Sequence, residues 1–158
     1  MQHIRLLMRL LPAIAVVVAV CAPISAHAAT PALTAVSEQS EVQQAVEAMQ
    51  LLLAAYTSGN ETRVESLLEP KMIGYSRVVD GMRDAQSSQR QLRLSLSDTR
   101  TQISEHVVLI QTQWEKRYVT NPGRQAVKKN GTCTLVMRPD LSGWRLSALN
   151  GDNPFSAD

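Results

Sequence analysis

The chain has 158 residues, of which 44% are hydrophobic and 19% are charged, and its formal net charge at pH 7 is +2. This length and balance fit one ordinary domain with enough chain to bury a hydrophobic core. A net charge so close to zero excludes the strongly basic field that gathers nucleic acid, so we expect no nucleic-acid partner.

The first 28 residues have the order of a secretory signal peptide. Arg5 and Arg9 precede an apolar run over 10–22, and a small-residue box follows at 26–28. The apolar run is shorter than the roughly 20 residues that cross a bilayer, and no stop-transfer anchor follows it. We therefore expect residues 1–28 to be removed, which leaves a periplasmic or secreted protein without a membrane span.

The two cysteines differ in their relation to this leader. Cys21 allows a competing interpretation, in which it receives a lipid anchor during export. A lipoprotein leader needs a small residue before this cysteine, however, and Val20 stands there. Cleavage after Ala28 is therefore favoured. Cys133 then remains alone, and an intramolecular disulfide is excluded. Its strand-like surroundings over 132–137 favour a buried thiol over an intermolecular bridge or a reactive group.

The N-terminal part of the mature chain is predicted to be a tether followed by a helix. Residues 29–39 are rich in Ala, Thr, Pro and Ser and show no period, so we expect a flexible tether. A single domain over 40–158 follows it. Apolar residues recur every three or four positions from Val42 to Tyr56, which predicts an amphipathic helix that ends at Gly59.

Three shorter elements are predicted next. Asn60 and Pro70 bound a second, short helix. The segment 72–79 is predicted to be a short strand. Apolar steps of three and four over 82–96 predict a third helix that begins near Asp80.

After Ser97 the period changes from helical to alternating, which predicts antiparallel strands. We expect one strand over 99–104, a turn at 105–106 and a long strand over 107–119. On the long strand one face carries Val108, Ile110, Thr112, Trp114 and Tyr118, and the other carries Gln111, Gln113, Glu115 and Arg117. The first face is expected to meet the core or a pocket, and the second to meet water.

The last part of the chain adds further strands. After a break at 121–123, a strand begins near Arg124 and reaches the pair Asn130–Gly131, which is either a tight hairpin turn or a kink within one strand that continues to Arg138. A final turn over 139–143 leads to a strand with Trp144, Leu146 and Ala148 on its apolar face.

Helices followed by antiparallel strands predict an α+β domain in which a curved sheet wraps around a long helix. This order, the break at Gly59–Asn60, and the endings GWRLS at 143–147 and GDNPF at 151–155 resemble the nuclear transport factor 2-like, cystatin-like cone fold. The resemblance covers residues 41–155 and is nearest to exported bacterial members of that superfamily, many of which have no assigned activity. It implies N-terminal helices packed into a curved antiparallel sheet.

The resemblance also implies a homodimer, because the open sheet face commonly mediates dimerisation in this fold. Gln111, Gln113, Glu115 and Arg117 would lie on or near that face. Their polarity argues against a very tight obligate interface.

No catalytic residue of the fold is carried over to this sequence. Isomerase-like members use a carboxylate where an ungapped alignment places Tyr75, whose phenol is a poor base at neutral pH. Dehydratase-like members use an inward His–Asp pair, whereas His106, the one mature histidine, is expected in a surface turn. Asp80 fits the cap of the third helix. We therefore expect no cofactor and no metal site, and we name no catalytic residue.

Seven large side chains form a candidate pocket lining inside the cone, suited to an apolar or flat ligand. The competing interpretation is that they fill the cone as ordinary core. They are Tyr56, Met72, Tyr75, Trp114, Tyr118, Met137 and Trp144.

Two basic groupings are candidate surfaces for an anionic ligand or an acidic partner. One contains Arg83, Arg90 and Arg93 on the predicted third helix; the other, near Pro122, contains Lys116 and the candidate partner-surface residues Arg117, Arg124, Lys128 and Lys129. Two of the 16 basic residues leave with the leader, so 14 basic residues face 14 acidic ones in the mature chain. This balance favours ordinary solvated faces.

Three functions stay open at this point. The leading hypothesis is an exported, non-enzymatic binding or assembly module whose partner is a small apolar ligand or an envelope protein. The second is a small isomerase or cyclase that acts on an apolar carbonyl compound through an inward carboxylate or histidine near Tyr56, Tyr75 and Trp114. The third is a subunit of a cell-envelope or secretion complex that docks through its sheet face or its basic edge over 117–129.

Overall fold

A computed structural model describes residues 30–157 of the chain. The signal peptide predicted over 1–28 lies outside these residues. Within the described part, no helix is long and apolar enough to cross a bilayer.

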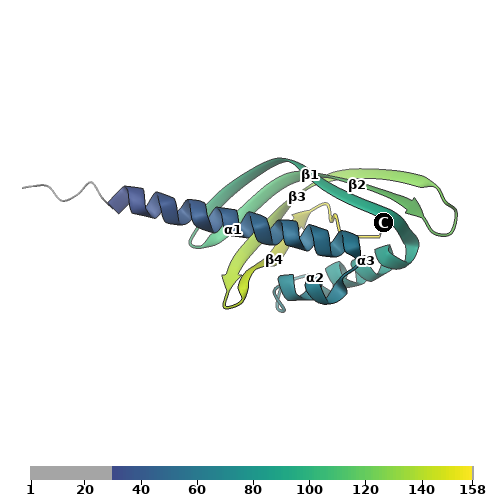
Figure 1. Cartoon of the computed structure of the whole chain (residues 1–158), viewed down its shortest axis with the longest axis horizontal. Helices are drawn as coiled ribbons and strands as arrows, with labels where there is room; N and C mark the ends of the chain where they lie inside the picture. Colours follow the sequence, from purple (N-terminus) through teal and green to yellow (C-terminus); the bar gives the residue numbers. More distant parts are fainter. Residues whose placement is uncertain (1–29, 158) are drawn as a thin grey trace, which may run out of the picture.

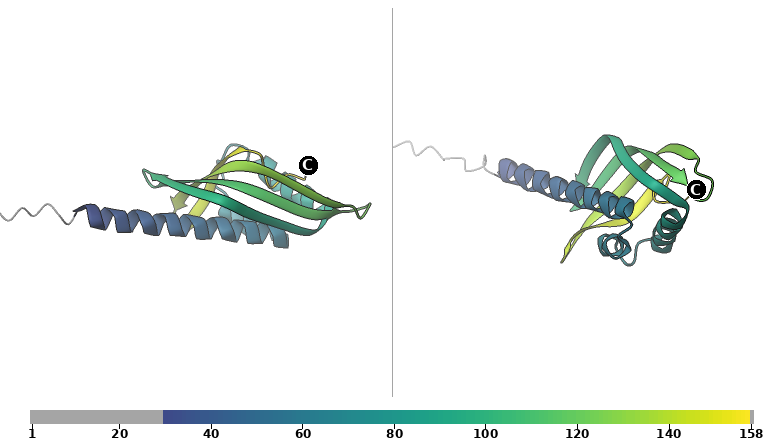
Figure 2. Two further views of the ribbon diagram at one scale, coloured as in Figure 1. Left: turned by 90° about the horizontal axis from the view of Figure 1, so that it is seen from above. Right: turned by 45° about the vertical axis from the view of Figure 1, so that its right-hand side comes forward.

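The described residues form three helices and one antiparallel sheet. In chain order the elements are α1 (Thr30–Ser58), α2 (Glu61–Leu67), α3 (Tyr75–Ser88), β1 (Gln89–Ser104), β2 (Val107–Thr120), β3 (Ala126–Asp140) and β4 (Gly143–Gly151). The sheet order is β1-β2-β3-β4, so each strand pairs with its neighbour in sequence. Figure 1 shows α1 along the sheet with α2 and α3 grouped near one end, and Figure 2 shows the curvature of the sheet beside α1. This is the predicted α+β architecture.

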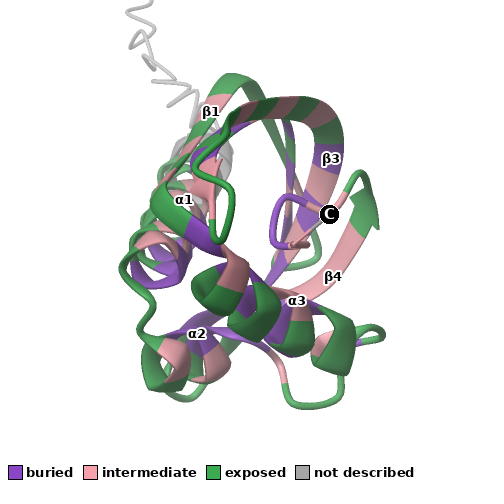
Figure 3. Ribbon diagram, turned by 90° about the vertical axis from the view of Figure 1, so that its right-hand side faces the viewer, coloured by how far each residue is buried: buried purple, intermediate pink, exposed green. Residues whose placement is uncertain are grey.

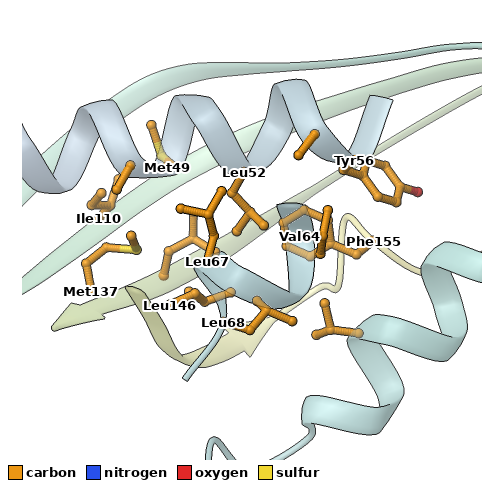
Figure 4. Packing of buried hydrophobic residues seen from close by; sticks show 14 of the residues in the cluster. Met49, Leu52, Tyr56, Val64, Leu67, Leu68, Ile110, Met137, Leu146 and Phe155 are labelled. Atoms are coloured by element: carbon orange, nitrogen blue, oxygen red, sulfur yellow. The ribbon is translucent and has the colours of Figure 1, made fainter. Parts of the chain in front are cut away.

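The core lies between α1 and the inner face of the sheet. Along α1 the buried stripe runs through Ala45, Met49, Leu52 and Tyr56, at the predicted spacing of three and four residues. Side chains from α2, β2, β3 and β4 complete the cluster, among them Val64, Leu67, Ile110, Met137 and Leu146 (Figure 4). Each large apolar side chain buried in this way contributes about 1.5–3 kcal/mol.

The first helix begins earlier than the sequence pattern predicts. The segment predicted as a tether, 29–39, is helical from Thr30 onward, and residues 35–40 are exposed. Ala, Glu and Gln are good helix formers, and Pro31 lies in the first turn, where a proline costs no hydrogen bond. The start of α1 extends beyond the sheet (Figure 1), and its residues 35–40 do not contribute to the core.

The strand predicted over 72–79 is wrong. Residues 72–74 form a turn, and α3 begins at Tyr75 after Gly74, which has a φ of 85°. Short apolar runs fit either a strand or a helix, and here the inward spacing of Val78, Val79 and Met82 decides for a helix. The third helix therefore begins earlier than Asp80.

The third helix also ends earlier in the structure than the sequence predicts. α3 ends at Ser88, and Gln89 already has the extended conformation of β1. Leu92, Leu94 and Leu96 alternate with exposed polar residues and are partly buried against the core. The sequence carries both a helical and an alternating period here, and pairing with β2 selects the alternating one.

The later strands agree with the sequence prediction. β2 matches the long strand predicted over 107–119 to within one residue, and its inner face is the predicted one. The turn at 105–106 is also confirmed. β3 runs without interruption through Asn130 and Gly131, so this pair lies within one strand and is not a hairpin turn.

Gly131 allows the neighbouring strand to place a tryptophan on the inner face. A Cβ atom added at Gly131 would lie 2.6 Å from Cζ2 of Trp114 and 2.8 Å from Cβ of Asp152. Real Cβ atoms essentially never approach other heavy atoms so closely. The missing side chain thus makes room for Trp114 and for the chain that follows β4.

We expect Gly131→Ala to lower the free energy of unfolding by about 1–3 kcal/mol, because the added methyl group overpacks a filled site. Urea denaturation followed by tryptophan fluorescence measures this change. Asn130→Ala, at the exposed neighbouring position, is the control and should stay within about 0.5 kcal/mol of the unmodified protein. Equal stability of the two variants would contradict the packing role of Gly131.

Candidate functional site

The candidate site is built around a buried lysine, Lys116, on the inner face of β2. Its side chain is 1% exposed, although lysine is almost never fully buried without a partner. The sequence analysis grouped Lys116 with surface cations, and this placement is wrong. The signal was present, because Lys116 lies between Trp114 and Tyr118 on the alternating face that was predicted to be inward.

Lys116 is held by groups from three parts of the fold. Its Nζ donates a hydrogen bond to the Tyr56 hydroxyl at 2.7 Å and a second to the Ser156 carbonyl oxygen. Nζ also lies 5.4 Å from the ring centre of Tyr56 and 5.6 Å from that of Tyr118, at the distance of a cation–π contact. The end of α1, the strand β2 and the C-terminal segment thus meet at one ammonium group.

Burial changes the acid–base behaviour of this pair. Desolvation, with a smaller contribution from the positive charge of Lys129, lowers the pKa of Lys116 to about 8. Burial, together with the nearby Tyr118, raises the pKa of Tyr56 well above its ordinary value. At neutral pH the site therefore holds an ammonium ion beside a neutral phenol, which can still donate its own proton in a hydrogen bond.

The chain after β4 closes the site, and we call residues 152–157 the closing segment. Phe155 is fully buried, with its ring edge-on to the Tyr56 ring at 5.2 Å between centres. In Figure 3 the buried part of this segment lies within the curve of the sheet. Phe155 and Ser156 therefore occupy the space in front of Lys116 and Tyr56.

Hydrogen bonds from the sheet hold both ends of the closing segment. Trp114 Nε1 donates to the Asp152 carbonyl at 3.1 Å, and the Thr132 amide donates to the Asp152 carboxylate at 3.0 Å. At the other end, Gln89 Nε2 donates to the Ala157 carbonyl at 2.8 Å. These contacts anchor the segment to β1, β2 and β3.

The seven candidate pocket residues do not form one lining. Six are buried: Tyr56, Met72, Trp114, Tyr118, Met137 and Trp144; Tyr75 is partly buried. Tyr56 and Tyr118 flank Lys116, and Trp114 contacts the closing segment. Met137 packs in the core below α1, and Trp144 donates to Gln44 Oε1 at 3.2 Å. The structure thus places two of the seven against Lys116 and a third against the closing segment.

The residues of the predicted basic edge also lie in different parts of the structure. Arg117 and Lys128 lie on the outer face of the sheet and contact the Glu115 carboxylate at 2.5 Å and 2.6 Å. The hydrogen bond from Lys128, and then that from Arg117, lowers the pKa of Glu115. Lys129 is partly buried, and Arg124 is exposed in the loop between β2 and β3 with a φ of 54°.

A basic residue from β1 joins Arg117 and Lys128 instead. Arg93, predicted on a helix, pairs with Arg117 in the sheet register, and Arg117 pairs with Lys128. The three line a surface hollow of about 790 Å³ together with Leu92, Tyr118 and Val127 among others. We call this feature the basic hollow.

Three other candidate groups stay apart from these sites. His106 lies exposed in the turn between β1 and β2, as predicted, 3.0 Å from the Glu41 carboxylate. Asp80 is within α3, 3.3 Å from Arg83, and is not the predicted helix cap. Cys133 is buried, as favoured, and burial raises the pKa of its thiol to about 11. The described residues contain no group of three or more side chains that could hold a metal ion.

The fold is shared with several solved structures. A nuclear transport factor 2-like superfamily protein from Salmonella enterica serovar Typhimurium has a TM-score of 0.66 at 14% identity, and the match covers 77% of this chain and 96% of that one. The chain has a nuclear transport factor 2-like fold. No protein-family model matches the sequence, and a comparison with curated proteins finds no match.

Other proteins with the nuclear transport factor 2-like fold differ in description. A candidate dehydratase from Streptomyces avermitilis has a TM-score of 0.63 at 15% identity, covering 72% of this chain and 95% of that one. A ketosteroid isomerase-like protein from Erwinia carotovora atroseptica has a TM-score of 0.55 at 11% identity, covering 72% and 98%. At such low identities the similarity establishes the fold alone.

The lowered pKa of Lys116 predicts a specific pH dependence of stability. Between pH 8 and about 10.4, where an unfolded lysine titrates, the unfolded chain keeps a proton that folded Lys116 has released. Unfolding then takes up a proton, so the contribution of Lys116 to the free energy of unfolding rises with pH in this window. Below pH 8 both states are protonated and the contribution is constant.

We therefore expect the unmodified protein to gain stability relative to Lys116→Met as the pH is raised from 7 to 10, measured as the difference between their midpoints of thermal unfolding. Cys133 and Tyr56 have raised pKa values, so their contributions to stability fall as the pH rises. Both residues are present in both proteins, so the comparison cancels much of this opposing effect. Lys71→Met removes an exposed lysine and is the control, for which the difference should not change with pH. A constant difference for Lys116→Met would show that its amine is not desolvated.

Proposed function

We propose that this protein is an exported, non-enzymatic binding module that docks an acidic segment of an envelope protein in the basic hollow. One observation carries the proposal. The space in front of Lys116 inside the cone is taken by Phe155, whereas the basic hollow of about 790 Å³ is open at the surface. A partner that approaches the folded protein meets the hollow first.

The charges of the basic hollow favour an acidic partner. Arg93, Arg117 and Lys128 occupy paired positions on three adjacent strands, and like charges in directly opposed positions destabilise a sheet. Glu115 neutralises part of this charge through Arg117 and Lys128. Among residues 30–157, Arg93 has no ion-pair partner, so the row keeps an excess of positive charge.

The apolar residues of the basic hollow narrow the partner further. Leu92, Tyr118 and Val127 line it beside the cations, so a ligand that only carries negative charge would leave their surface uncovered. A peptide segment with alternating acidic and apolar side chains would satisfy both kinds of group. A protein supplies acidic and apolar side chains side by side in this way, so we favour a protein over a polysaccharide as the partner.

We expect a fluorescently labelled peptide of alternating Glu and Phe residues to bind the protein. The double variant Arg93→Gln/Lys128→Gln should bind this peptide about tenfold more weakly at 0.15 M salt. Fluorescence anisotropy measures the affinity. Arg63→Gln/Arg77→Gln removes two exposed arginines outside the hollow and is the charge-matched control. An equal loss in both double variants would mean that net charge, and not the hollow, attracts the peptide.

We infer that the protein reaches this partner by export, with cleavage after Ala28. The inference is supported by the order of the leader, in which two basic residues, an apolar run and a small-residue box follow one another.

We expect N-terminal sequencing of the protein from the periplasm of a Gram-negative host to start at Ala29. Cys21→Ser should leave this N-terminus unchanged, because the mature chain would not include Cys21. A mature chain that begins at a lipid-modified Cys21 would contradict cleavage after Ala28 and would make the protein a membrane-anchored lipoprotein.

A further inference from the structure

The closing segment is a part of the cone wall that has no regular secondary structure. Residues 152–157 form neither helix nor strand. Hydrogen bonds to Asp152, Ser156 and Ala157 hold them, each with a net worth of about 1 kcal/mol, and Phe155 adds its burial against Tyr56. Segments without regular secondary structure can open locally at a lower cost than global unfolding.

The hydrogen-bond partners of Lys116 among residues 30–157 carry no charge. Its hydrogen bonds go to a phenol and to a peptide carbonyl, both of which are neutral. Among residues 30–157, no carboxylate forms an ion pair with Lys116. A buried charge without an opposite charge is costly, so an anion at this position would be bound more strongly than the carbonyl oxygen it replaced.

The closing segment indicates what kind of anion fits. It presents an aromatic ring, that of Phe155, against Tyr56, and an acceptor oxygen, that of Ser156, to Lys116 Nζ. A carboxylic acid with an aromatic ring at the far end of a short alkyl chain presents the same two groups. 6-Phenylhexanoate has as many chain atoms between ring and carboxyl carbon as lie between the Phe155 ring and the Ser156 carbonyl carbon.

We propose that the space filled by Phe155 and Ser156 is a binding site for aryl-alkyl carboxylates, with Lys116 and Tyr56 as the carboxylate anchors and the closing segment as a competing internal ligand. The ammonium group of Lys116 supplies the charge, and the free proton of the Tyr56 hydroxyl supplies a second hydrogen bond. The rings of Tyr56 and Tyr118 provide the apolar surroundings. This site lies inside the cone; it shares the Tyr118 ring with the basic hollow, whose three cations lie on the outer face of the sheet.

The two tryptophans report separately on the closing segment. The Trp114 indole donates to Asp152 of the segment, whereas the Trp144 indole donates to Gln44 of α1. A ligand that displaces Phe155 and Ser156 changes the surroundings of Asp152, the acceptor of Trp114, and leaves those of Gln44, the acceptor of Trp144, unchanged. The two indole signals in a ¹H–¹⁵N spectrum therefore form a probe and its internal control.

The test titrates the protein with 6-phenylhexanoate and with its neutral analogue 6-phenylhexanamide, followed by calorimetry and by the indole signals. We expect the carboxylate to bind at least about tenfold more tightly than the amide, because its hydrogen bond to the ammonium is charge-assisted. The Trp114 signal should shift on binding, and the Trp144 signal should not.

Variants test separately the role of Lys116 as carboxylate anchor and that of Phe155 as internal ligand. Lys116→Met should bind acid and amide equally, whereas Lys129→Met, which removes the same charge from the paired position on β3, should keep the preference for the acid. Phe155→Ala removes the internal ligand and should bind the acid at least about tenfold more tightly than the unmodified protein.

A second variant keeps the test decisive if Phe155→Ala does not fold. Asn153→Ala removes the side-chain acceptor that holds the Phe155 amide at 2.9 Å and leaves the anchors untouched, so it should bind the acid several-fold more tightly. Equal binding of acid and amide by the unmodified protein, binding without a change at Trp114, or no binding at all would each overturn the proposal.

Discussion

The packing of one stripe of α1 against the inner face of the sheet is the interaction on which the rest of the structure depends. Ala45, Met49 and Leu52 give this stripe its apolar surface, and Tyr56 ends it. Because the sheet curves around α1, the stripe also decides which strand positions point inward. Lys116 is one of these positions, so the same packing that builds the core carries an ammonium group into it.

This burial has a cost that the neighbouring residues offset only in part. Tyr56 supplies an oxygen and a π face, Tyr118 supplies a second π face, and Ser156 supplies a carbonyl oxygen, but each of these partners is neutral. A core built for stability alone would place an apolar side chain at this position. The amine, the phenol and the removable segment in front of them together explain why we assign a binding role to the interior of the cone.

The sequence predicts the elements whose pattern is long and unambiguous. The stripe from Val42 to Tyr56 and the alternation along β2 are periodic enough to place α1 and β2 correctly. The segment from Met72 to Leu96 fails because its apolar residues fit both periods, and only contacts with α2 and β2 decide between them. The closing segment could not be predicted as part of a site, because its role depends on contacts with strands far away in the sequence.

The basic residues show why a cluster in sequence is a poor guide to a cluster in space. Neighbouring residues on a strand point to opposite faces of the sheet, so Lys116 faces the core while Arg117 faces outward. The same alternation separates Lys128, which contacts Glu115 outside, from Lys129, which is paired with Lys116. What looks like one basic edge is thus two electrostatic environments on the two sides of one sheet. The outer one is wet and suits a partner that docks on the folded protein, whereas the inner one is dry and suits a small anion that can take the place of the closing segment.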